Sequence, residues 1–298
     1  MSTILVTGGA GFIGSHLVDA LVKRKHRVVV VDDLSVGKRS HVHPQARFIK
    51  YSVAGQALAR MLRPYRFSHV YHLAAQKNLQ VSKRFPVADA TTNIIGTLQC
   101  IQIAAQSRAK LIFYSTAAVY DPSASPPSRE SECAAPVTPY GIAKYAAELY
   151  IRQSGLRYSI LRLSNVYGPR QDAYGEGGVV AIFSDRLARG KICTIFNTGR
   201  QTRDFVYVTD VVSASLMALS RGTNQVVNIS TGIETTVLRL YRALEKISGR
   251  NQPVRRGQVV EQYRSALGNI RARTILKWRP RITMEQGLRT TYQWFITK

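Results

Sequence analysis

Thr7-Gly8-Gly9-Ala10-Gly11-Phe12-Ile13-Gly14 is the stretch that decides the fold, because it joins an apolar run at 4–7 to residues with helical spacing. Gly8 and Gly11 let the backbone turn and approach a pyrophosphate, and Gly14 lets the helix pack close to the sheet. The N-terminus of the helix adds N–H groups and a partial positive charge that favour an anion. The stretch therefore predicts a dinucleotide-binding loop.

An acidic residue follows the second apolar run, Arg27-Val28-Val29-Val30-Val31, at the position that such a loop requires. We expect Asp32 to accept hydrogen bonds from the adenosine ribose hydroxyls. This favours NAD, because a carboxylate at that position repels a 2′-phosphate. Lys38 and Arg39 lie nearby in the sequence and keep NADP as an alternative.

Short apolar runs alternate with helical patterns through the first half of the chain. The alternation predicts a Rossmann-type α/β fold with a doubly wound parallel sheet and right-handed crossovers. We expect an NAD-binding domain over 1–166 and a smaller C-terminal α/β lobe over 167–298, with exchange of a strand or helix between them left open. A Pro/Ser-rich segment at 122–139 predicts a loop. The six expected strands are 4–7, 27–31, 48–51, 69–73, 110–114 and 158–163.

The charge of the chain is strongly basic, with 42 lysines and arginines against 17 acids and a formal net charge of +25. A basic balance favours polyanionic partners such as nucleic acid, anionic membranes or polyphosphate substrates. The sequence carries no zinc-finger or RNA-binding motif. We therefore favour a solvated basic surface over a nucleic-acid partner.

The three cysteines, Cys100, Cys133 and Cys193, lie far apart and show no metal or redox spacing. They predict reduced thiols and no metal site. No apolar run approaches the roughly 20 residues that span a bilayer. The first residues enter a strand pattern without the features of a signal peptide. We therefore expect a cytoplasmic protein that does not bind membranes.

A tyrosine and a lysine stand four residues apart in Tyr140-Gly141-Ile142-Ala143-Lys144, so on a helix they share one face. A free phenol has a pKa of about 10 and is a poor base at neutral pH. An ammonium about 4–5 Å away supplies roughly 3–4 kcal/mol toward its ionisation, and the positive nicotinamide of NAD supplies more. The pair therefore predicts a general base near neutrality. Thr116 offers a hydroxyl to the substrate oxygen and to the phenol.

Taken together, these motifs identify a resemblance to the extended short-chain dehydrogenase/reductase superfamily and, within it, to the UDP-glucose 4-epimerase group. The resemblance runs nearly end to end. It implies proton removal from the sugar 4-hydroxyl by Tyr140 while the C4 hydride passes to NAD and later returns to the other face. The matching segments are 7–14, 31–37, 72–76, 93–97, 115–120, 139–144, 162–170 and 201–211.

The same resemblance implies the remaining ligand contacts and the assembly. Asn165, Arg203 and Arg255 match positions that contact the diphosphate of a UDP-sugar, and Val180, Gln258 and Gln262 match other substrate positions, as does Thr116. A homodimer is implied, with helices near 89–105 and 140–153 at the interface. The cofactor positions are Gly8, Gly11, Phe12, Ile13, Gly14, Asp32, Ser35, Gly37, Ser52, Val53, Leu73, Ala74, Ala75, Asn93, Tyr140 and Lys144.

Several departures from the family pattern bear on the reaction. Related 4,6-dehydratases carry an Asp-Glu pair directly after the catalytic Thr, where this chain has Ala117 and Ala118. That difference favours epimerisation over dehydration. Gln258 replaces the usual ribose-binding acid, and Gln262 stands at the position that limits sugar size, so the sugar stays open. The alternatives are another NAD-dependent nucleotide-sugar enzyme, such as a UDP-glucuronate epimerase or a reductase, and a catalytically weak binding module.

Overall fold

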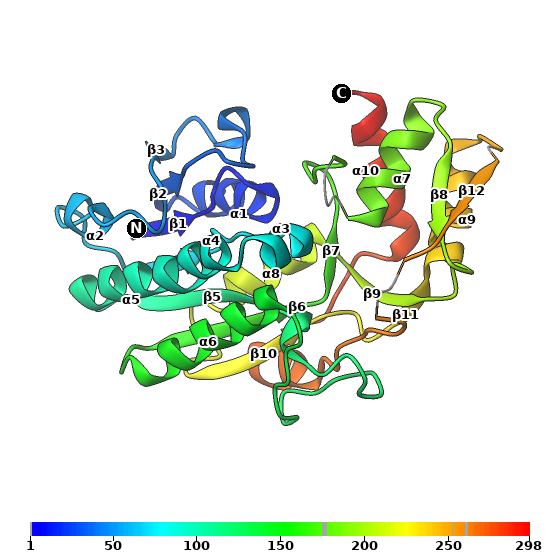
Figure 1. Ribbon diagram of the computed structural model, residues 1–298. Helices are drawn as coiled ribbons and strands as arrows, with labels where there is room; N and C mark the ends of the chain where they lie inside the picture. The colour runs from blue at the N-terminus through cyan, green and yellow to red at the C-terminus, as the bar shows by residue number, and fades with distance from the viewer. Residues whose placement is uncertain (1, 175–177, 252, 260–261) are drawn as a thin grey trace.

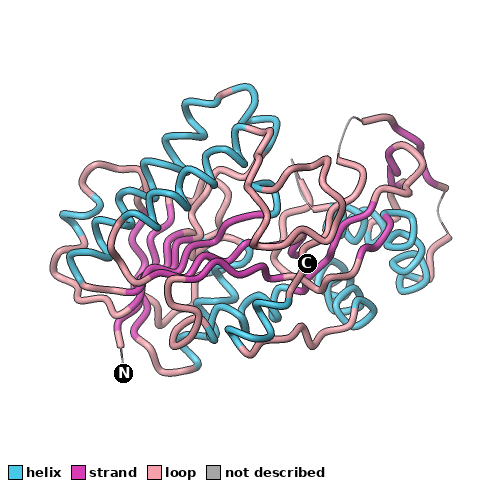
Figure 2. Tube along the Cα trace, turned by 90° about the horizontal axis from the view of Figure 1, so that it is seen from below, coloured by secondary structure: helices cyan, strands magenta, loops and turns pink. Residues whose placement is uncertain are grey.

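A seven-stranded parallel sheet forms the centre of the protein in the computed structural model, which describes residues 2–174, 178–251, 253–259 and 262–298. The strand order is β10-β6-β5-β4-β1-β2-β3, and helices cover both faces (Figure 2). This order confirms the predicted Rossmann-type fold. The strands are β1 (Thr3–Thr7), β2 (Arg27–Asp32), β3 (Arg47–Lys50), β4 (His69–His72), β5 (Lys110–Thr116), β6 (Tyr158–Leu163) and β10 (Gln225–Ile229).

Each strand is apolar on both sides because both faces of the sheet are covered. On one face Ile4 and Val6 pack with α1 (Phe12–Lys23) and α8 (Val208–Met217). On the other face Leu5 packs with the second group of helices. This alternation along β1 places the sheet between two apolar layers. The helices of the second group are α2 (Leu58–Met61), α5 (Gly96–Ser107) and α6 (Pro139–Gln153).

The seventh strand, β10, reaches the sheet from the C-terminal half of the chain. After β6 the chain enters the second lobe, and it returns at Gln225–Ile229 to pair with β6 in parallel. The sequence expectation of six strands missed it, since five residues within an irregular stretch carry too little periodicity. The structure therefore shows an exchange of the kind left open, and a division near residue 166 remains a prediction.

The second lobe is built around a separate apolar core (Figure 1). Three helices, α7 (Val179–Ala188), α9 (Val237–Ser248) and α10 (Met284–Ile296), pack against one another there. Two small sheets accompany them. One contains β11 (Glu234–Thr236), β9 (Thr202–Tyr207) and β7 (Asn165–Tyr167), and the other contains β12 (Val254–Gly257) and β8 (Cys193–Phe196).

The other helical segments are short. They are α3 (Leu79–Arg84), α4 (Pro86–Ala90), the π-helical turn η2 (Thr91–Ile95), the 3₁₀ turns η1 (Arg39–His41) and η3 (Ala117–Val119), and the π-helical turn η4 (Ala272–Leu276). Among the described residues, no helix has both the length and the apolar character needed to cross a membrane.

The carboxyl ends of the parallel strands meet at one edge of the large sheet. β1 ends there at Thr7, β2 at Asp32 and β5 at Thr116. The predicted loop at 122–139 follows β5 at this edge and contains no helix before Pro139. In open α/β sheets this edge is where ligands bind. The fold therefore gathers most of the sequence-predicted site residues in one place.

Candidate active site

The glycine loop between β1 and α1 is packed so closely that side chains are excluded. Gly8 has φ +72°, and a Cβ built on it would lie 2.5 Å from the Ala74 backbone nitrogen. A Cβ on Gly14 would lie 2.1 Å from the Gly8 carbonyl oxygen. Gly11 is the N-cap residue of α1, so Phe12 and Ile13 open the helix. The loop thus presents backbone N–H groups that fit a pyrophosphate.

Asp32 is held at the end of β2 by backbone donors. Its Oδ2 accepts from Ala10 N at 2.9 Å, and its Oδ1 accepts from Leu34 N at 2.9 Å. Burial raises the pKa of this carboxyl, which these two hydrogen bonds oppose. A Cβ on Gly37 would lie 2.9 Å from Asp32 Oδ1, so the glycine permits this approach. The carboxylate keeps lone pairs for ribose hydroxyls, while Ser35 is exposed beside it.

The ends of β3 and β4 form the neighbouring wall. Val53 is buried and packs against Gly96, where a Cβ would meet it at 2.7 Å. Ser52 is exposed, and the three residues after β4 are half-buried, namely Leu73, Ala74 and Ala75. Asn93 is 1% exposed, donates from Nδ2 to the Gln76 carbonyl at 2.9 Å, and has no hydrogen-bond partner for Oδ1. An unpaired buried acceptor of this kind fits a ligand hydroxyl.

Thr116 and Tyr140 are brought together by the start of α6. Thr138 caps this helix by accepting from Gly141 N at 3.1 Å. A Cβ on Gly141 would lie 2.3 Å from the Ala118 carbonyl oxygen, so only glycine lets α6 approach the turn after β5. A hydrogen bond from the Thr116 hydroxyl lowers the pKa of Tyr140, which places the two side chains in contact.

Lys144 lies one turn further along α6, beneath the surface. It is 2% exposed, and its Nζ sits 4.0 Å from the centroid of the Phe113 ring. Burial lowers the pKa of Lys144 to about 7, while the negative charges of Glu148 and Asp89 oppose this decrease. Burial and these two negative charges therefore act on the pKa of Lys144 in opposite directions.

The pKa of Tyr140 departs from the sequence-based expectation. Burial raises it to about 12, the Thr116 hydrogen bond lowers it, and the charge of Asp89 raises it. We expected the Lys144 ammonium to bring the phenol near neutrality. The effect of burial on the phenol dominates instead, because the charged form loses its hydration. Further positive charge is needed to make Tyr140 a base near neutral pH.

His72, at the end of β4, lies at the same edge of the large sheet and has a structural role. It is 1% exposed, and its ring nitrogens bond Thr7 Oγ1 at 2.8 Å and Thr97 Oγ1 at 3.0 Å. Burial lowers the pKa of His72 to about 3. The imidazole is therefore neutral at physiological pH and links β1, β4 and α5.

Two of the predicted diphosphate-binding residues come from adjacent strands of the second lobe. Asn165 is exposed and opens β7, where it pairs with Phe205 of β9. Arg203 is half-buried two residues earlier on β9, and its Nη1 donates to the Thr202 carbonyl at 2.8 Å. Val180 is 1% exposed in the first turn of α7, so only its backbone is available to a ligand.

The third predicted arginine lies on the two-stranded sheet. Arg255 is exposed on β12 opposite Thr194. A hollow of about 930 Å³ is lined by Arg256 and Gln258 but not by Arg255. Neighbouring residues of a strand face opposite sides, so Arg255 and Arg256 lie on opposite faces of β12. The other lining residues are Asn197, Thr198, Gly257 and Val259.

Gln262 lies beside the loop that follows β5. Its Nε2 donates to the Pro122 carbonyl at 3.4 Å, and its side chain is exposed. This contact joins the second lobe to the loop that carries the chain toward Tyr140.

Three polar residues of this region were missed by the sequence reasoning. Gln76 donates from Nε2 to Asp89 Oδ1 at 2.9 Å, and Asp89 is 1% exposed with no hydrogen-bond partner for Oδ2. Glu148 is fully buried four residues after Lys144. Helical spacing from Lys144 could have indicated Glu148, whereas no local pattern indicates Gln76 or Asp89.

Comparisons with known proteins agree with this geometry. A UDP-glucose 4-epimerase from Mycolicibacterium smegmatis is 36% identical over 99% of this chain and 98% of its own length. The crystal structure of a UDP-glucose 4-epimerase from Thermotoga maritima with UDP-glucose is 43% identical, with a TM-score of 0.96 and 99% of both chains covered. That of the Thermus thermophilus enzyme in complex with NAD is 35% identical, with a TM-score of 0.91 and 98% of both covered.

The family description for NAD dependent epimerases and dehydratases matches residues 4–230. This match spans the glycine loop, the Thr116-Tyr140-Lys144 group and β10. It confirms the superfamily resemblance, the enzyme class and the cofactor that the sequence predicts. The chain belongs to the NAD dependent epimerase/dehydratase family.

Proposed function

We propose that this protein interconverts the two C4 epimers of a UDP-sugar. The observation that carries the proposal is the contact of Thr116 with Tyr140, with Lys144 one turn further along α6 and with Ala117 and Ala118 in the turn that follows β5. These alanines place no acid where an elimination of water would need one. The site is therefore equipped for proton and hydride transfer at one carbon.

Each residue of the site has a separate role in the proposed reaction. Tyr140 takes the proton of the sugar 4-hydroxyl, and Thr116 holds both the phenol and the substrate oxygen. NAD, held by the glycine loop, Asp32 and Asn93, would supply reversible hydride transfer at the sugar C4 and the positive charge of its nicotinamide. Lys144 adds its ammonium. Together these charges oppose the effect of burial on the pKa of Tyr140.

The chain's own groups fit both ligands. The glycine loop, Asp32 and Asn93 would hold NAD, since the loop excludes side chains and Asn93 offers an unpaired acceptor. Arg203 and Asn165 lie on neighbouring strands and would hold a diphosphate, to which a guanidinium binds in bidentate fashion. Arg255 and Gln258 remain proposed contacts of the substrate.

The proposal is tested by incubating the purified protein with UDP-glucose, UDP-galactose and their N-acetyl forms without added reductant. NMR of each mixture should show the C4 epimer of at least one sugar. Formation of a 4-keto-6-deoxy sugar would indicate a dehydratase instead. Folded, NAD-loaded protein that yields no C4 epimer from any sugar would refute the proposal.

We also propose a homodimer formed through α4, η2 and α6. These elements pack on one another and leave large apolar side chains exposed. Val87 of α4 is 79% exposed, the largest exposed fraction among these side chains. The other exposed residues are Ile95, Ile142, Leu149 and Tyr150. Light scattering should give the mass of a dimer for the natural chain and of a monomer for Val87→Glu; a monomeric natural chain would contradict this.

A further inference from the structure

A third residue, an acidic one, continues the line of catalytic side chains along α6. Tyr140, Lys144 and Glu148 are spaced four residues apart, so they follow one face of the helix. Glu148 has no exposed surface. Burying a carboxylate costs free energy unless its oxygens accept hydrogen bonds or form ion pairs. Glu148 lies one helical turn from Lys144, so its partners bear on the site.

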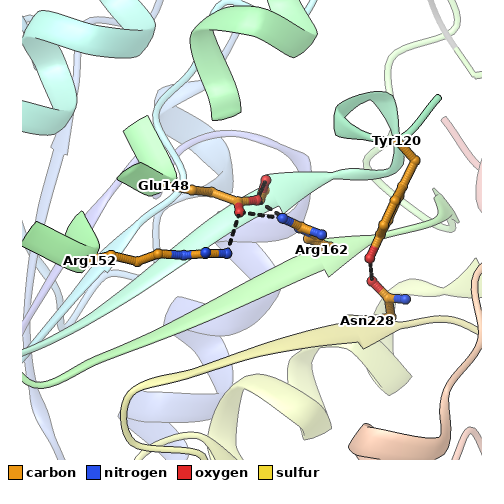
Figure 3. A network of polar contacts seen from close by, with 6 residues as sticks. Tyr120, Glu148, Arg152, Arg162 and Asn228 are labelled. Carbon is orange, nitrogen blue, oxygen red and sulfur yellow. Dashed lines mark hydrogen bonds and ion pairs between the residues drawn. The ribbon is translucent and has the colours of Figure 1, made fainter. Parts of the chain in front are cut away.

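The Glu148 carboxylate is fully paired (Figure 3). Arg162 of β6 donates from Nε to Oε1 at 2.9 Å and from Nη2 to Oε2 at 2.6 Å. Ser115 of β5 donates from Oγ to Oε1 at 2.5 Å. The fork of Arg162 matches the carboxylate plane, which fixes the orientation of Glu148 as well as its charge. Arg152 adds a contact at 3.4 Å from the solvent side.

These contacts connect α6 to β5 and β6 next to Thr116. Ser115 and Arg162 are register partners on β5 and β6, and Thr116 is the next residue of β5. The carboxylate therefore holds α6 at a fixed rotation beside the strand that carries Thr116. Tyr140 and Thr116 meet only if that rotation is kept, because both belong to these two elements.

The same arginine is anchored on its far side. Its guanidinium carbon lies 4.8 Å from the centroid of the Tyr120 ring, and Tyr120 Oη donates to Asn228 Oδ1 at 2.8 Å (Figure 3). Asn228 belongs to β10, and its backbone nitrogen donates to Glu130 Oε1 at 2.7 Å. The network thus extends from α6 to β10 and to the loop after β5.

The charges around Lys144 come from four elements. On α6 it interacts with Glu148; α4 contributes Asp89, α5 contributes Cys100, and β4 contributes His72. Burial lowers the pKa of Lys144, and among the groups that oppose burial the largest contribution is that of Glu148. Burial raises the pKa of Cys100 and lowers that of His72, so both are neutral and only Glu148 and Asp89 bring negative charge.

We propose that Glu148 is a positioning residue for the reaction, which holds the Thr116-Tyr140 geometry through Ser115 and Arg162 and keeps the Lys144 ammonium charged. The proposal rests on the proposed epimerase function for its kinetic consequences. It does not need that function for its effect on Lys144 itself.

The deciding change is Glu148→Gln, which keeps the shape and removes the charge. Arg162 then loses its paired carboxylate, and Lys144 loses the negative charge that most opposes the effect of burial. The titration midpoint of Lys144 should fall by about 1 pH unit or more, as expected for loss of a close opposite charge. The alkaline limb of kcat/KM should move to lower pH by a similar amount, with little change in KM and in bound NAD.

Two measurements follow the effect in the NAD-loaded protein. Carbon-13 NMR of the lysine ε-carbons reports Lys144 directly, with its signal identified by its absence in Lys144→Arg. The pH profile of epimerisation reports the kinetic consequence. If no UDP-sugar is turned over, the NMR titration still tests Glu148, so the failure of the proposed function and that of this inference are distinguishable.

Matched variants separate charge from folding. Arg152→Ala removes the solvent-side contact and should leave the Lys144 titration in place, because that arginine is 35% exposed. Adding Arg162→Met to Glu148→Gln removes the guanidinium that Glu148 pairs with and should leave the midpoint lowered, because the negative charge that opposes the effect of burial on Lys144 is still missing. Ser115→Ala removes one hydrogen bond to Glu148 and should lower the Lys144 midpoint slightly. It is the alternative variant if Glu148→Gln does not fold.

The inference is overturned if Glu148→Gln is folded and the Lys144 midpoint stays within the error of the natural protein. It is equally overturned if the double variant returns the midpoint to its natural value, since the loss of the Glu148 charge would then not be the cause of the shift. A loss of kcat without any movement of the alkaline limb would assign Glu148 a purely structural role.

Discussion

The glycine-loop edge and the exposed β8–β12 sheet are two regions for which we propose ligand contacts, and close packing constrains the first far more than the second. At the first, an added Cβ on Gly8 or Gly14 would lie within 2.5 Å of backbone atoms. At the second, Arg255 and Arg256 are exposed on the short strand β12, and Gln258 is exposed directly after it. Close packing fixes what a residue must be, whereas an exposed strand accepts many side chains. The comparison predicts where substitutions abolish activity and where they adjust it.

The largest effect is expected at the edge of the large sheet. Tyr140→Phe removes the general base while keeping the ring, so kcat should fall by about 10²- to 10⁴-fold. The NAD content of the purified variant should match that of the natural protein, since the loop is untouched. Turnover near the natural rate would show that another group removes the proton.

Gly14→Ala tests the packing of the same region. Its Cβ would lie 2.1 Å from the Gly8 carbonyl, so α1 must move away from the loop. We expect a loss of about 1–3 kcal/mol in the free energy of unfolding together with weaker NAD binding. Chemical denaturation and cofactor titration measure both. The matched control is Gly249→Ala, which has open space around it and only its positive φ to strain.

The second region should respond more mildly. Arg255→Ala and Arg256→Ala remove guanidinium groups on opposite faces of β12. If Arg255 binds the diphosphate, its loss should raise KM roughly tenfold, as expected for a hydrogen bond to a charged group. NAD binding should be unaffected in both. A larger effect from Arg256, which lines the hollow beside Gln258, would reassign the contact.

The smallest effect is expected at Gln262, which bonds the Pro122 carbonyl at 3.4 Å. Gln262→Ala should change the ratio of kcat/KM between N-acetyl and plain sugars by less than about tenfold. Competition experiments with both sugars measure that ratio. A change in NAD affinity would contradict the separation of the two regions.

Sequence reasoning succeeded where backbone geometry demands particular residues. The glycine loop, the acid at the end of β2 and the Tyr-Lys spacing on α6 follow from conformations and periods that few other residues satisfy. The loop at 122–139 follows from its prolines. These features are sufficient to locate the edge of the sheet and to indicate the family.

Other features could not be predicted because they depend on contacts between distant segments. β10 joins the sheet only at Gln225–Ile229, long after β6 ends at Leu163, and the pairing of Asp89 with Gln76 depends on how two short segments fold back. The pKa of Tyr140 is another example. Its rise to about 12 comes from burial, which local spacing to Lys144 does not reveal.

The most direct test of the account uses UDP-glucose with deuterium at C4. If Tyr140 acts at the edge of the sheet as described, NMR should show UDP-galactose that retains the deuterium at C4, without added reductant and without exchange into water. Loss of the label to solvent would indicate proton abstraction from carbon. No epimer of any UDP-sugar from folded, NAD-loaded protein would contradict the account.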